Sequence, residues 1–491
     1  MSNSSPVFRG AKVPPDDPRY PTLMRGFNQR WVGTPRGILV CGDAKQVLKA
    51  VQDAIDQSLR ITVRGGGHCY EDFVSGNHDG VIIDLSPLNS VYKEPNQDVF
   101  CVEGGCTLWN VYTQLYKEYG RTIPGGSCYS VGVGGHVAGG GYGLLSRLHG
   151  LVVDYLYAIE LIHVNERGKA EIVKVSRDSA TEDEIALLWA HQGGGGGNFG
   201  IVTKYWFKNP PVAPTLASLG SIAWDWDRFD RDSFTELVTN YGRFLKRHSQ
   251  VDSVFKSLFA LLHLTKKEAG SQIVLTMQAA YDDPEPIAEF VNAIKLTKVE
   301  HGPQRVSVGY HHFVPDAMEA RTMTWLEATQ TLDPSGPNQR GKYKSAYMIE
   351  EFPQTQIDVM WEYLTDTSYH NSQALVQVDS YGCQINAVAP DKTAVPQRSS
   401  IMKLQYQTYW TDAKDDATNL SWIRNFYGEM YGSRGPYPNG TVDGCYVNYP
   451  DVDLVDWHYL YYKDNYPKLQ QVKRKWDPLN IFNHQQSIRL P

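Results

Sequence analysis

The chain has 491 residues, of which 42% are hydrophobic and 21% charged, values that suit a globular protein long enough for two domains. Its net charge of −7 gives no excess of basic residues for binding nucleic acid. No apolar run approaches the roughly 20 residues that span a bilayer. We therefore expect neither a nucleic-acid nor a membrane partner. Residues 1–6 lack the charged and apolar regions of a secretory signal, which predicts a cytoplasmic protein.

The first part of the chain alternates short strands and helices. Val47, Val51 and Ile55 recur four residues apart, the spacing of one face of an amphipathic helix. Thr107 is expected to cap a second helix. Strands are predicted at residues 37–41, 60–64, 81–84 and 99–102. This is an α+β pattern rather than a regular βαβ repeat.

A run of five glycines at residues 193–197 precedes Asn-Phe-Gly, so residues 195–200 match the GxGxxG pattern of dinucleotide-binding folds. That fingerprint requires a strand before the glycines and a helix after them. Here a predicted helix at 184–191 precedes them and an alternating strand at 201–207 follows. We therefore reject a nicotinamide site. Taken alone, the run is also compatible with a flexible surface linker.

Three prolines within residues 209–214 mark the expected domain boundary, because proline continues neither a helix nor a central strand. Beyond this point the chain is rich in aromatic residues and has no glycine clusters. Such a change of amino-acid composition suits a second domain that holds substrate.

Two glycine-dense stretches each contain a nucleophilic side chain. His68 lies in Arg-Gly-Gly-Gly-His-Cys-Tyr at residues 64–70, and Cys128 lies near the start of residues 125–143. Glycine loses more backbone entropy on folding than any other residue, so such clusters indicate positive φ angles or backbone pressed against a ligand. From the residues alone, His68 could instead bond locally within its loop, and Cys128 could be a small buried hydrophobe. The seven cysteines show no metal-type pairing and require no disulfide, so no metal is expected.

These two stretches resemble the bicovalently flavinylated, berberine-bridge-enzyme-like oxidases of the vanillyl-alcohol-oxidase superfamily. Residues 196–203, 446–453, 466–478 and 486–488 extend the resemblance through almost the whole chain. The bacterial oxidases that tailor glycosylated antibiotics look especially similar. Together these motifs are specific, although each one alone is weak.

The resemblance implies an α+β, two-domain PCMH-type FAD-binding fold with an inserted substrate domain built on an antiparallel sheet backed by helices. The expected FAD-binding domain covers residues 1–211, and the expected substrate-binding domain covers 212–435. Because flavin motifs reappear near Tyr446, residues 436–491 are expected to return to the FAD-binding domain.

In this family a histidine at the position of His68 bonds to the flavin 8α-methyl group, and the resemblance makes Cys128 the thiolate bonded to flavin C6. A neutral imidazole suits the first bond, and histidine is readily neutral near pH 7. Cys69 is a competing thiol, but its side chain should point away from that of His68 in an extended loop. His136 resembles a histidine that contacts the ribityl chain. The implied cofactor-binding residues are Arg64, Gly65, Gly66, Gly67, His68, Cys128, Val131, Gly134, Gly135, His136, Gly139, Gly140, Gly200, Ile201, Val202, Asn448 and Tyr449.

Flavin oxidation of an alcohol also needs a base, and the cofactor leaves this role to the protein. Three tyrosines match catalytic or substrate-facing positions of the antibiotic-tailoring relatives, namely Tyr142, Tyr381 and Tyr449. We favour Tyr449 as the base, with Tyr142 and Tyr381 as its activating or positioning partners. A tyrosine base must be activated, since its ordinary pKa is about 10. Plant relatives often use a glutamate instead, and the sequence identifies none here.

Val131 occupies a position where, in the resembling family, a small residue leaves a pocket for oxygen near flavin C4a. The alternative is that Val131 simply packs under the flavin ring.

The resemblance therefore implies an FAD-linked oxidase that converts an alcohol carbon of a sugar, oligosaccharide or glycosylated secondary metabolite to a carbonyl. Dioxygen would be reduced to hydrogen peroxide. The expected partners are a small-molecule substrate and O2; the oligomeric state is left open. Two alternatives remain: an oxidative cyclase or desaturase of an alkaloid- or polyketide-like metabolite, and a flavin-bearing binding protein without turnover.

Overall fold

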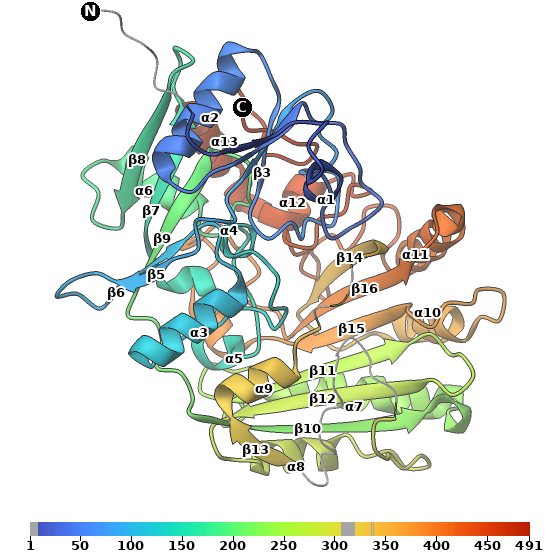
Figure 1. The fold of residues 1–491 in the computed structure, drawn as a ribbon. Coiled ribbons are helices and arrows are strands. Elements are labelled where there is room, and N and C mark those ends of the chain that lie inside the picture. Colours follow the sequence, from blue (N-terminus) through green and yellow to red (C-terminus); the bar gives the residue numbers. More distant parts are fainter. Residues whose placement is uncertain (1–7, 306–319, 335, 337) are drawn as a thin grey trace, which may run out of the picture.

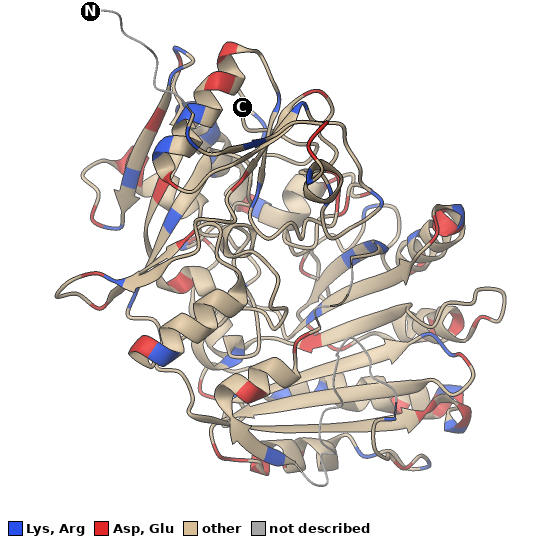
Figure 2. Ribbon diagram, in the orientation of Figure 1, with Lys and Arg blue, Asp and Glu red and all other residues tan. Residues whose placement is uncertain are grey.

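The computed structural model describes residues 8–305, 320–334, 336 and 338–491 (Figure 1). The amino-terminal residues on which the absence of a secretory signal rests lie outside these ranges. No helix within them is both long and apolar enough to cross a bilayer. Basic and acidic residues are interspersed along the helices and loops (Figure 2).

The first sheet has four strands in the order β1-β2-β4-β3. Strands β2, β4 and β3 are parallel, and β1 is antiparallel to β2. The predicted helix α2 is confirmed: Asp43 caps it, and Val47 and Val51 are buried. Strand β3 ends at Arg64 and so leads directly into the first glycine loop. The elements of this part are β1 (Ala11–Val13), α1 (Tyr20–Leu23), β2 (Gly37–Val40), α2 (Ala44–Asp56), β3 (Ile61–Arg64) and β4 (Val81–Asp84).

The second sheet has five antiparallel strands in the order β5-β6-β9-β7-β8. Thr107 caps α3 as predicted, and Gly120 ends this helix with a φ of 62°. The second glycine stretch forms the loop between α3 and the short helix α4. The elements are β5 (Val91–Lys93), β6 (Val99–Glu103), α3 (Leu108–Tyr119), α4 (Val133–Ala138), α5 (Ser146–His149), β7 (Leu156–Val164), β8 (Ala170–Ser176), α6 (Glu182–Ala190) and β9 (Ile201–Lys208).

The glycine run at 193–197 follows α6 and precedes β9. This helix-then-strand order is the reverse of the Rossmann fingerprint, so the rejection of a nicotinamide motif on that ground agrees with the structure.

The third sheet has seven antiparallel strands in the order β13-β10-β12-β11-β15-β16-β14. Helices α7, α8, α10 and α11 back it, with α10 contacting both α7 and α11 (Figure 1). The antiparallel, helix-backed sheet and the α+β class are therefore confirmed. The elements are β10 (Leu216–Asp225), α7 (Arg231–Arg247), β11 (Leu258–Thr265), β12 (Gln272–Ala280), α8 (Glu285–Ala293), β13 (Arg321–Thr324), α9 (Trp325–Thr331), β14 (Arg340–Met348), α10 (Gln354–Thr365), β15 (Leu375–Ser380), β16 (Met402–Trp410) and α11 (Asp416–Tyr431).

The carboxy-terminal helices α12 (Trp457–Tyr462) and α13 (Tyr466–Trp476) follow the third sheet in sequence, but α13 packs on α6. The buried Lys473 of α13 donates to the carbonyl of Asn198 across 2.7 Å. The end of the chain thus lies against the glycine run. Division of the chain at residues 211 and 435 stays a prediction.

Candidate active site

A cavity of about 890 Å³ lies where the two glycine loops, the third sheet and the carboxy-terminal segment meet. Ligand pockets in proteins commonly measure roughly 300–1,000 Å³, so this space suits a large cofactor with a substrate. Most of the predicted site residues line it: Arg64, Gly65, Gly66, Gly67, His68, Cys128, Val131, Gly134, Gly135, His136, Tyr142, Gly200, Ile201, Val202, Asn448 and Tyr449.

Gly139, Gly140 and Tyr381 lie behind the cavity wall instead. A Cβ at Gly139 would lie 2.1 Å from the side-chain oxygen of Asn448, and one at Gly140 would lie 2.9 Å from Val395. These two glycines therefore allow close packing of the protein against itself, which differs from the predicted contact with cofactor.

The remaining glycines give the cavity a backbone lining. A Cβ on Gly66 would come within 2.2 Å of the amide nitrogen of Gly132, so the two glycine loops touch through bare backbone. Gly135 has open space where its Cβ would stand, and it lines the cavity. Such a surface exposes peptide groups to a ligand, and backbone N–H groups of this kind bind phosphate. The residues present therefore fit a dinucleotide.

Arg64 was expected to bind the cofactor, but its guanidinium is already engaged by other groups of the protein. Its Nε donates to Asp84 across 2.7 Å, and its terminal nitrogens reach the Asp84 carboxylate and the carbonyls of Leu23 and Arg25. The parallel pairing of β3 with β4 sets Arg64 opposite Asp84. The arginine thus fixes the start of the His68 loop. Backbone N–H groups remain as the hydrogen-bond donors for a phosphate.

The imidazole of His68 is held on its face and on its edge. The ring of Phe27 stacks on it, with 4.6 Å between centroids and 20° between planes. Nε2 lies 2.8 Å from the hydroxyl oxygen of Ser130. Burial lowers the pKa of His68 to about 4, so the ring is neutral near pH 7, as a nitrogen nucleophile must be.

Both candidate thiols, Cys69 and Cys128, line the cavity. Burial raises the pKa of Cys69 to about 11, so this thiol stays protonated and weakly nucleophilic at neutral pH. Cys128 Sγ lies 3.8 Å from Ser130 Oγ, the oxygen that also contacts His68. The geometry therefore favours Cys128 as the second nucleophile.

His136 is buried beside the second glycine loop. Its Nε2 accepts a hydrogen bond from the amide of Gly126 across 3.2 Å, and its carbonyl accepts from Asn448. Burial and the Lys403 charge lower the pKa of His136 to about 4. With its Nε2 lone pair engaged, His136 suits a role in shaping the cavity better than one as a base.

Tyr449 faces the cavity from the carboxy-terminal segment, and its hydroxyl accepts a hydrogen bond from Lys403 Nζ across 2.9 Å. Lys403 is fully buried and pairs with Asp379 at 2.5 Å. Burial and the Asp379 carboxylate raise the pKa of Tyr449 well above its ordinary value. The donated hydrogen bond from an ammonium opposes that rise, because it stabilises the phenolate.

The other two tyrosines do not touch the Tyr449 hydroxyl. Tyr142 donates its own proton to the carbonyl of Ser380 across 2.6 Å, and its ring lies 4.5 Å from Lys403 Nζ. Tyr381 is fully buried behind Tyr142, with 5.3 Å between ring centroids. Lys403 is therefore the group that donates a hydrogen bond to the Tyr449 hydroxyl, and the Tyr142 ring lies beside that same ammonium.

Neutral amides cover the part of the third sheet next to Lys403. Gln407 Nε2 donates to the side-chain oxygens of Gln377 and Gln405, each across 3.0 Å. Gln377 in turn donates to Asp379. All three glutamines line the cavity, which gives this wall several donors and acceptors with no net charge of its own.

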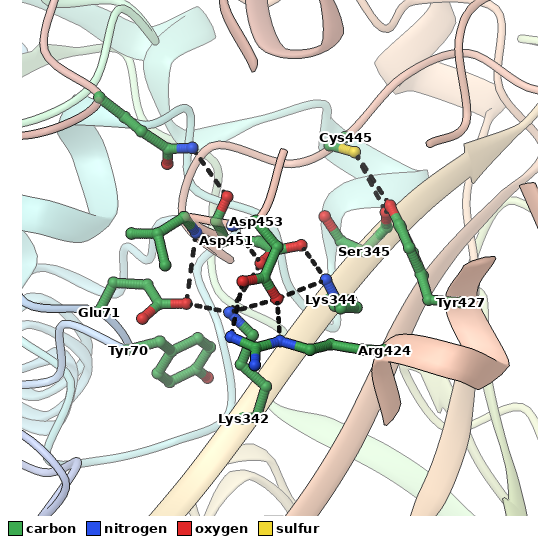
Figure 3. Close-up of polar contacts among 12 residues, drawn as sticks. Tyr70, Glu71, Lys342, Lys344, Ser345, Arg424, Tyr427, Cys445, Asp451 and Asp453 are labelled. Atoms are coloured by element: carbon green, nitrogen blue, oxygen red, sulfur yellow. Dashed lines mark hydrogen bonds and ion pairs between the residues drawn. The ribbon is translucent and has the colours of Figure 1, made fainter. Parts of the chain in front are cut away.

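A group of charges with a buried centre, which we call the β14 ion cluster, fixes the loops that carry His68 and Tyr449. Lys342 Nζ pairs with Glu71 and donates to Asp451 across 2.7 Å, and Lys344 donates to the other oxygen of Asp451. Glu71 follows the first glycine loop, and Asp451 follows Tyr449. Three cations face three carboxylates in the cluster, whose members are Glu71, Lys342, Lys344, Arg424, Asp451 and Asp453 (Figure 3).

Sequence reasoning missed Lys403, Asp379 and the glutamines. The signal that could have found them is a polar residue at every second position of the segments that form β16 and β15, Lys-x-Gln-x-Gln in residues 403–407 and Gln-x-Asp in 377–379. Alternation of this kind places polar side chains on one face of a sheet. Phe27 and Ser130 were also missed, and no pattern in the sequence places them beside His68.

Two family models match the chain. An FAD-binding domain model matches residues 35–172, and a model described as berberine and berberine-like matches residues 445–489. Hexose oxidase from Chondrus crispus is 39% identical over 96% of this chain and 93% of its own length. The chain is a berberine-bridge-enzyme-like, FAD-linked oxidoreductase.

Other members of this family show the same extent of similarity. Aclacinomycin-N/aclacinomycin-A oxidase from Streptomyces galilaeus is 39% identical over 98% of this chain and 90% of its own length. The crystal structure of a glycopeptide hexose oxidase in complex with teicoplanin superposes with a TM-score of 0.90 at 36% identity, covering 99% of this chain and 100% of the other. The shared fold therefore includes both the FAD-binding part and the third sheet.

Proposed function

We propose that this FAD-linked oxidoreductase carries its flavin on both His68 and Cys128 and oxidises an alcohol carbon of a sugar or glycosylated metabolite to a carbonyl, with dioxygen reduced to hydrogen peroxide. The observation that carries the proposal is the hydroxyl of Tyr449, a partly buried residue. This hydroxyl accepts a hydrogen bond from the Lys403 ammonium, and Tyr449 lines the same cavity as both nucleophiles.

FAD would supply the hydride acceptor when bound. The backbone of the two glycine loops and of the run before β9 would hold it, with Asn448 and His136 packed beside them. Two covalent bonds would retain the flavin without the protein having to enclose it. The cleft can therefore stay open to a bulky substrate.

Tyr449 would accept the proton of the substrate hydroxyl as the adjacent carbon loses hydride. Lys403 would lower the free energy of the phenolate through the hydrogen bond that it donates. Asp379 would keep the lysine charged and in place by its ion pair at 2.5 Å. Tyr142 would hold the ammonium from the side through its ring face.

The amide-covered wall supports a neutral, polyhydroxylated substrate. Gln377, Gln405 and Gln407 offer donors and acceptors suited to adjacent hydroxyl groups, and they lie on the strands that carry Asp379 and Lys403. The relatives named as hexose oxidase and aclacinomycin oxidase support the same substrate class. We further propose the division into residues 1–211, 212–435 and 436–491, because α13 lies against α6 while β10 to β16 form a separate sheet.

A substrate screen coupled to peroxide detection tests the proposal. It should compare free hexoses, oligosaccharides and glycosylated aromatic compounds. Peroxide together with an oxidised sugar is expected. Formation of a cyclised or desaturated product would select the cyclase alternative, and flavin that no compound reduces would select a binding protein.

A further inference from the structure

Ser130 lies between the two nucleophiles, in the second glycine stretch. Its hydroxyl oxygen is 2.8 Å from His68 Nε2 and 3.8 Å from Cys128 Sγ. Ser130 is exposed and does not line the cavity, whereas His68 and Cys128 do. The serine therefore contacts both nucleophiles from outside the cofactor space.

The contact between Ser130 Oγ and His68 Nε2 fixes one tautomer of the neutral imidazole if Nε2 is the donor. A neutral ring has one N–H and one lone pair, and the hydrogen bond at one nitrogen determines which tautomer is present. When Nε2–H donates to the serine oxygen, the lone pair lies on Nδ1 of His68. Stacking by Phe27 fixes the plane in which that lone pair lies.

The same hydroxyl can direct its proton to Cys128. A hydroxyl accepts at its oxygen and donates its single hydrogen, so one serine serves a donor and an acceptor together. A hydrogen bond to sulfur favours the thiolate, which is the nucleophilic form.

We propose that Ser130 is a positioning residue for flavin attachment, which presents Nδ1 of His68 and the sulfur of Cys128 in their reactive forms. This inference rests on the bicovalent flavin of the proposed function. It assigns to a side chain outside the cavity a role in building the holoenzyme.

The attachment balances with dioxygen as the oxidant. At each point a C–H bond of the flavin is replaced by a C–N or C–S bond to the protein. The hydrogen lost from the flavin carbon and the proton lost from the nucleophile leave with two electrons and convert O2 to H2O2. Ser130 is unchanged, because it only holds and passes a proton.

The test measures attachment and not turnover. Full-length protein is purified at set times after induction and digested, and mass spectrometry gives the flavin-bearing fraction of the peptides that contain His68 and Cys128. In Ser130→Ala we expect both fractions to rise roughly three- to ten-fold more slowly, the factor that one net hydrogen bond is worth. Ser130→Thr keeps the hydroxyl and should restore the wild-type rate. Ser90→Ala removes a hydroxyl from an exposed residue that does not line the cavity and should leave the rate unchanged.

Two variants that each keep one nucleophile test the effects of Ser130 on His68 and on Cys128 separately. In Cys128→Ala, the added Ser130→Ala change should still slow attachment at His68; in His68→Ala, it should still slow attachment at Cys128. Wild-type protein with no adduct at either residue would overturn the bicovalent flavin and this inference together. Normal adducts in wild type with an unchanged rate in Ser130→Ala, in a variant that keeps its unfolding temperature, would overturn the role of Ser130 alone.

Discussion

Lys403 donates a hydrogen bond to the hydroxyl of Tyr449 across 2.9 Å, and its ammonium also lies 4.3 Å from the centre of that tyrosine ring. The lysine lies on β16 of the third sheet, and the tyrosine lies in the carboxy-terminal segment. In the proposed function, the proton acceptor is thus assembled from two parts of the chain, and its basicity depends on how these parts pack together.

Tyr449→Phe removes one hydroxyl and should lower the rate of flavin reduction by substrate roughly hundred- to ten-thousand-fold, the usual effect of losing a general base. Flavin content should be unchanged, because the ring remains. Anaerobic stopped-flow absorbance measures the rate. Tyr281→Phe, at a side chain outside the cavity, is the control. An unchanged rate in Tyr449→Phe would transfer the role of base to Tyr142.

Lys403→Met should slow flavin reduction by roughly ten- to hundred-fold, since a hydrogen bond to a charged group is worth about 1.5–3 kcal/mol. Burial and Asp379 already raise the pKa of Tyr449. Loss of the ammonium raises it further, so the rising limb of the reduction rate should move to higher pH. A pH series of stopped-flow traces measures this displacement.

An unpaired Asp379 could perturb the site by itself in that variant. The double change Lys403→Met/Asp379→Asn removes this charge and should keep the displaced pH profile. A wild-type profile in the double variant would show that Lys403 acts only by balancing Asp379.

His68→Ala and Cys128→Ala should each leave one covalent link, and only the double variant should release FAD on acid precipitation. The reason is that each residue reaches the cavity independently, from a separate glycine loop. Intact-protein mass spectrometry and the absorbance of the supernatant measure the outcome. Free flavin released from the Cys128→Ala variant would show that His68 forms no bond.

Val131→Leu should slow reoxidation of the reduced enzyme by dioxygen and leave its reduction by substrate unaltered. Val131 lines the cavity and is partly buried, so one added methylene occupies space there without touching Tyr449 or Lys403. Stopped-flow mixing of reduced enzyme with oxygenated buffer gives the rate. Superimposable traces would assign Val131 to packing, and slow reoxidation of the native protein would make it a dehydrogenase.

Lys342→Met should lower the free energy of unfolding by about 3–5 kcal/mol, because it leaves the buried Glu71 carboxylate without an ion partner. The side chains of Lys342 and Glu71 are both 1% exposed. Urea unfolding measures the loss, with Lys414→Met at an exposed site as the control. Addition of Glu71→Gln removes the charge imbalance and should recover part of the stability; no recovery would mean that Asp451 carries the effect.

Local features of the sequence were enough for strands β2, β3, β4, β6 and β9 and for helices α2, α3 and α6. The site residues were taken from the family resemblance, and most of them line the cavity. Helix α3 begins at Thr107 because a side-chain cap acts within one turn. Long-range pairing was not available from such features. The partner of Arg64 is Asp84, which the parallel register of β3 and β4 brings opposite it. The activating lysine lies on β16, whose position beside β15 depends on the folding of the whole third sheet.

Glycine content alone also could not distinguish two uses of the residue. Gly135 faces open space, whereas Gly139 is pressed against Asn448. Both belong to the same motif, and only the packed structure separates the glycine that faces a ligand from the one that lets two segments of the protein meet.

The β14 ion cluster has an evolutionary consequence. Both loops that carry reacting groups are fastened to β14, which is the last strand of its sheet, while β13, β10 and β12 occupy the opposite end. The loop between β11 and β12 lines the cavity through Glu268, Ala269, Gly270 and Ser271. It carries none of the proposed reacting groups, so we expect mutations there to change the cavity wall and leave His68, Cys128 and Tyr449 in place. The enzyme can thus come to accept new substrates through mutations in this loop.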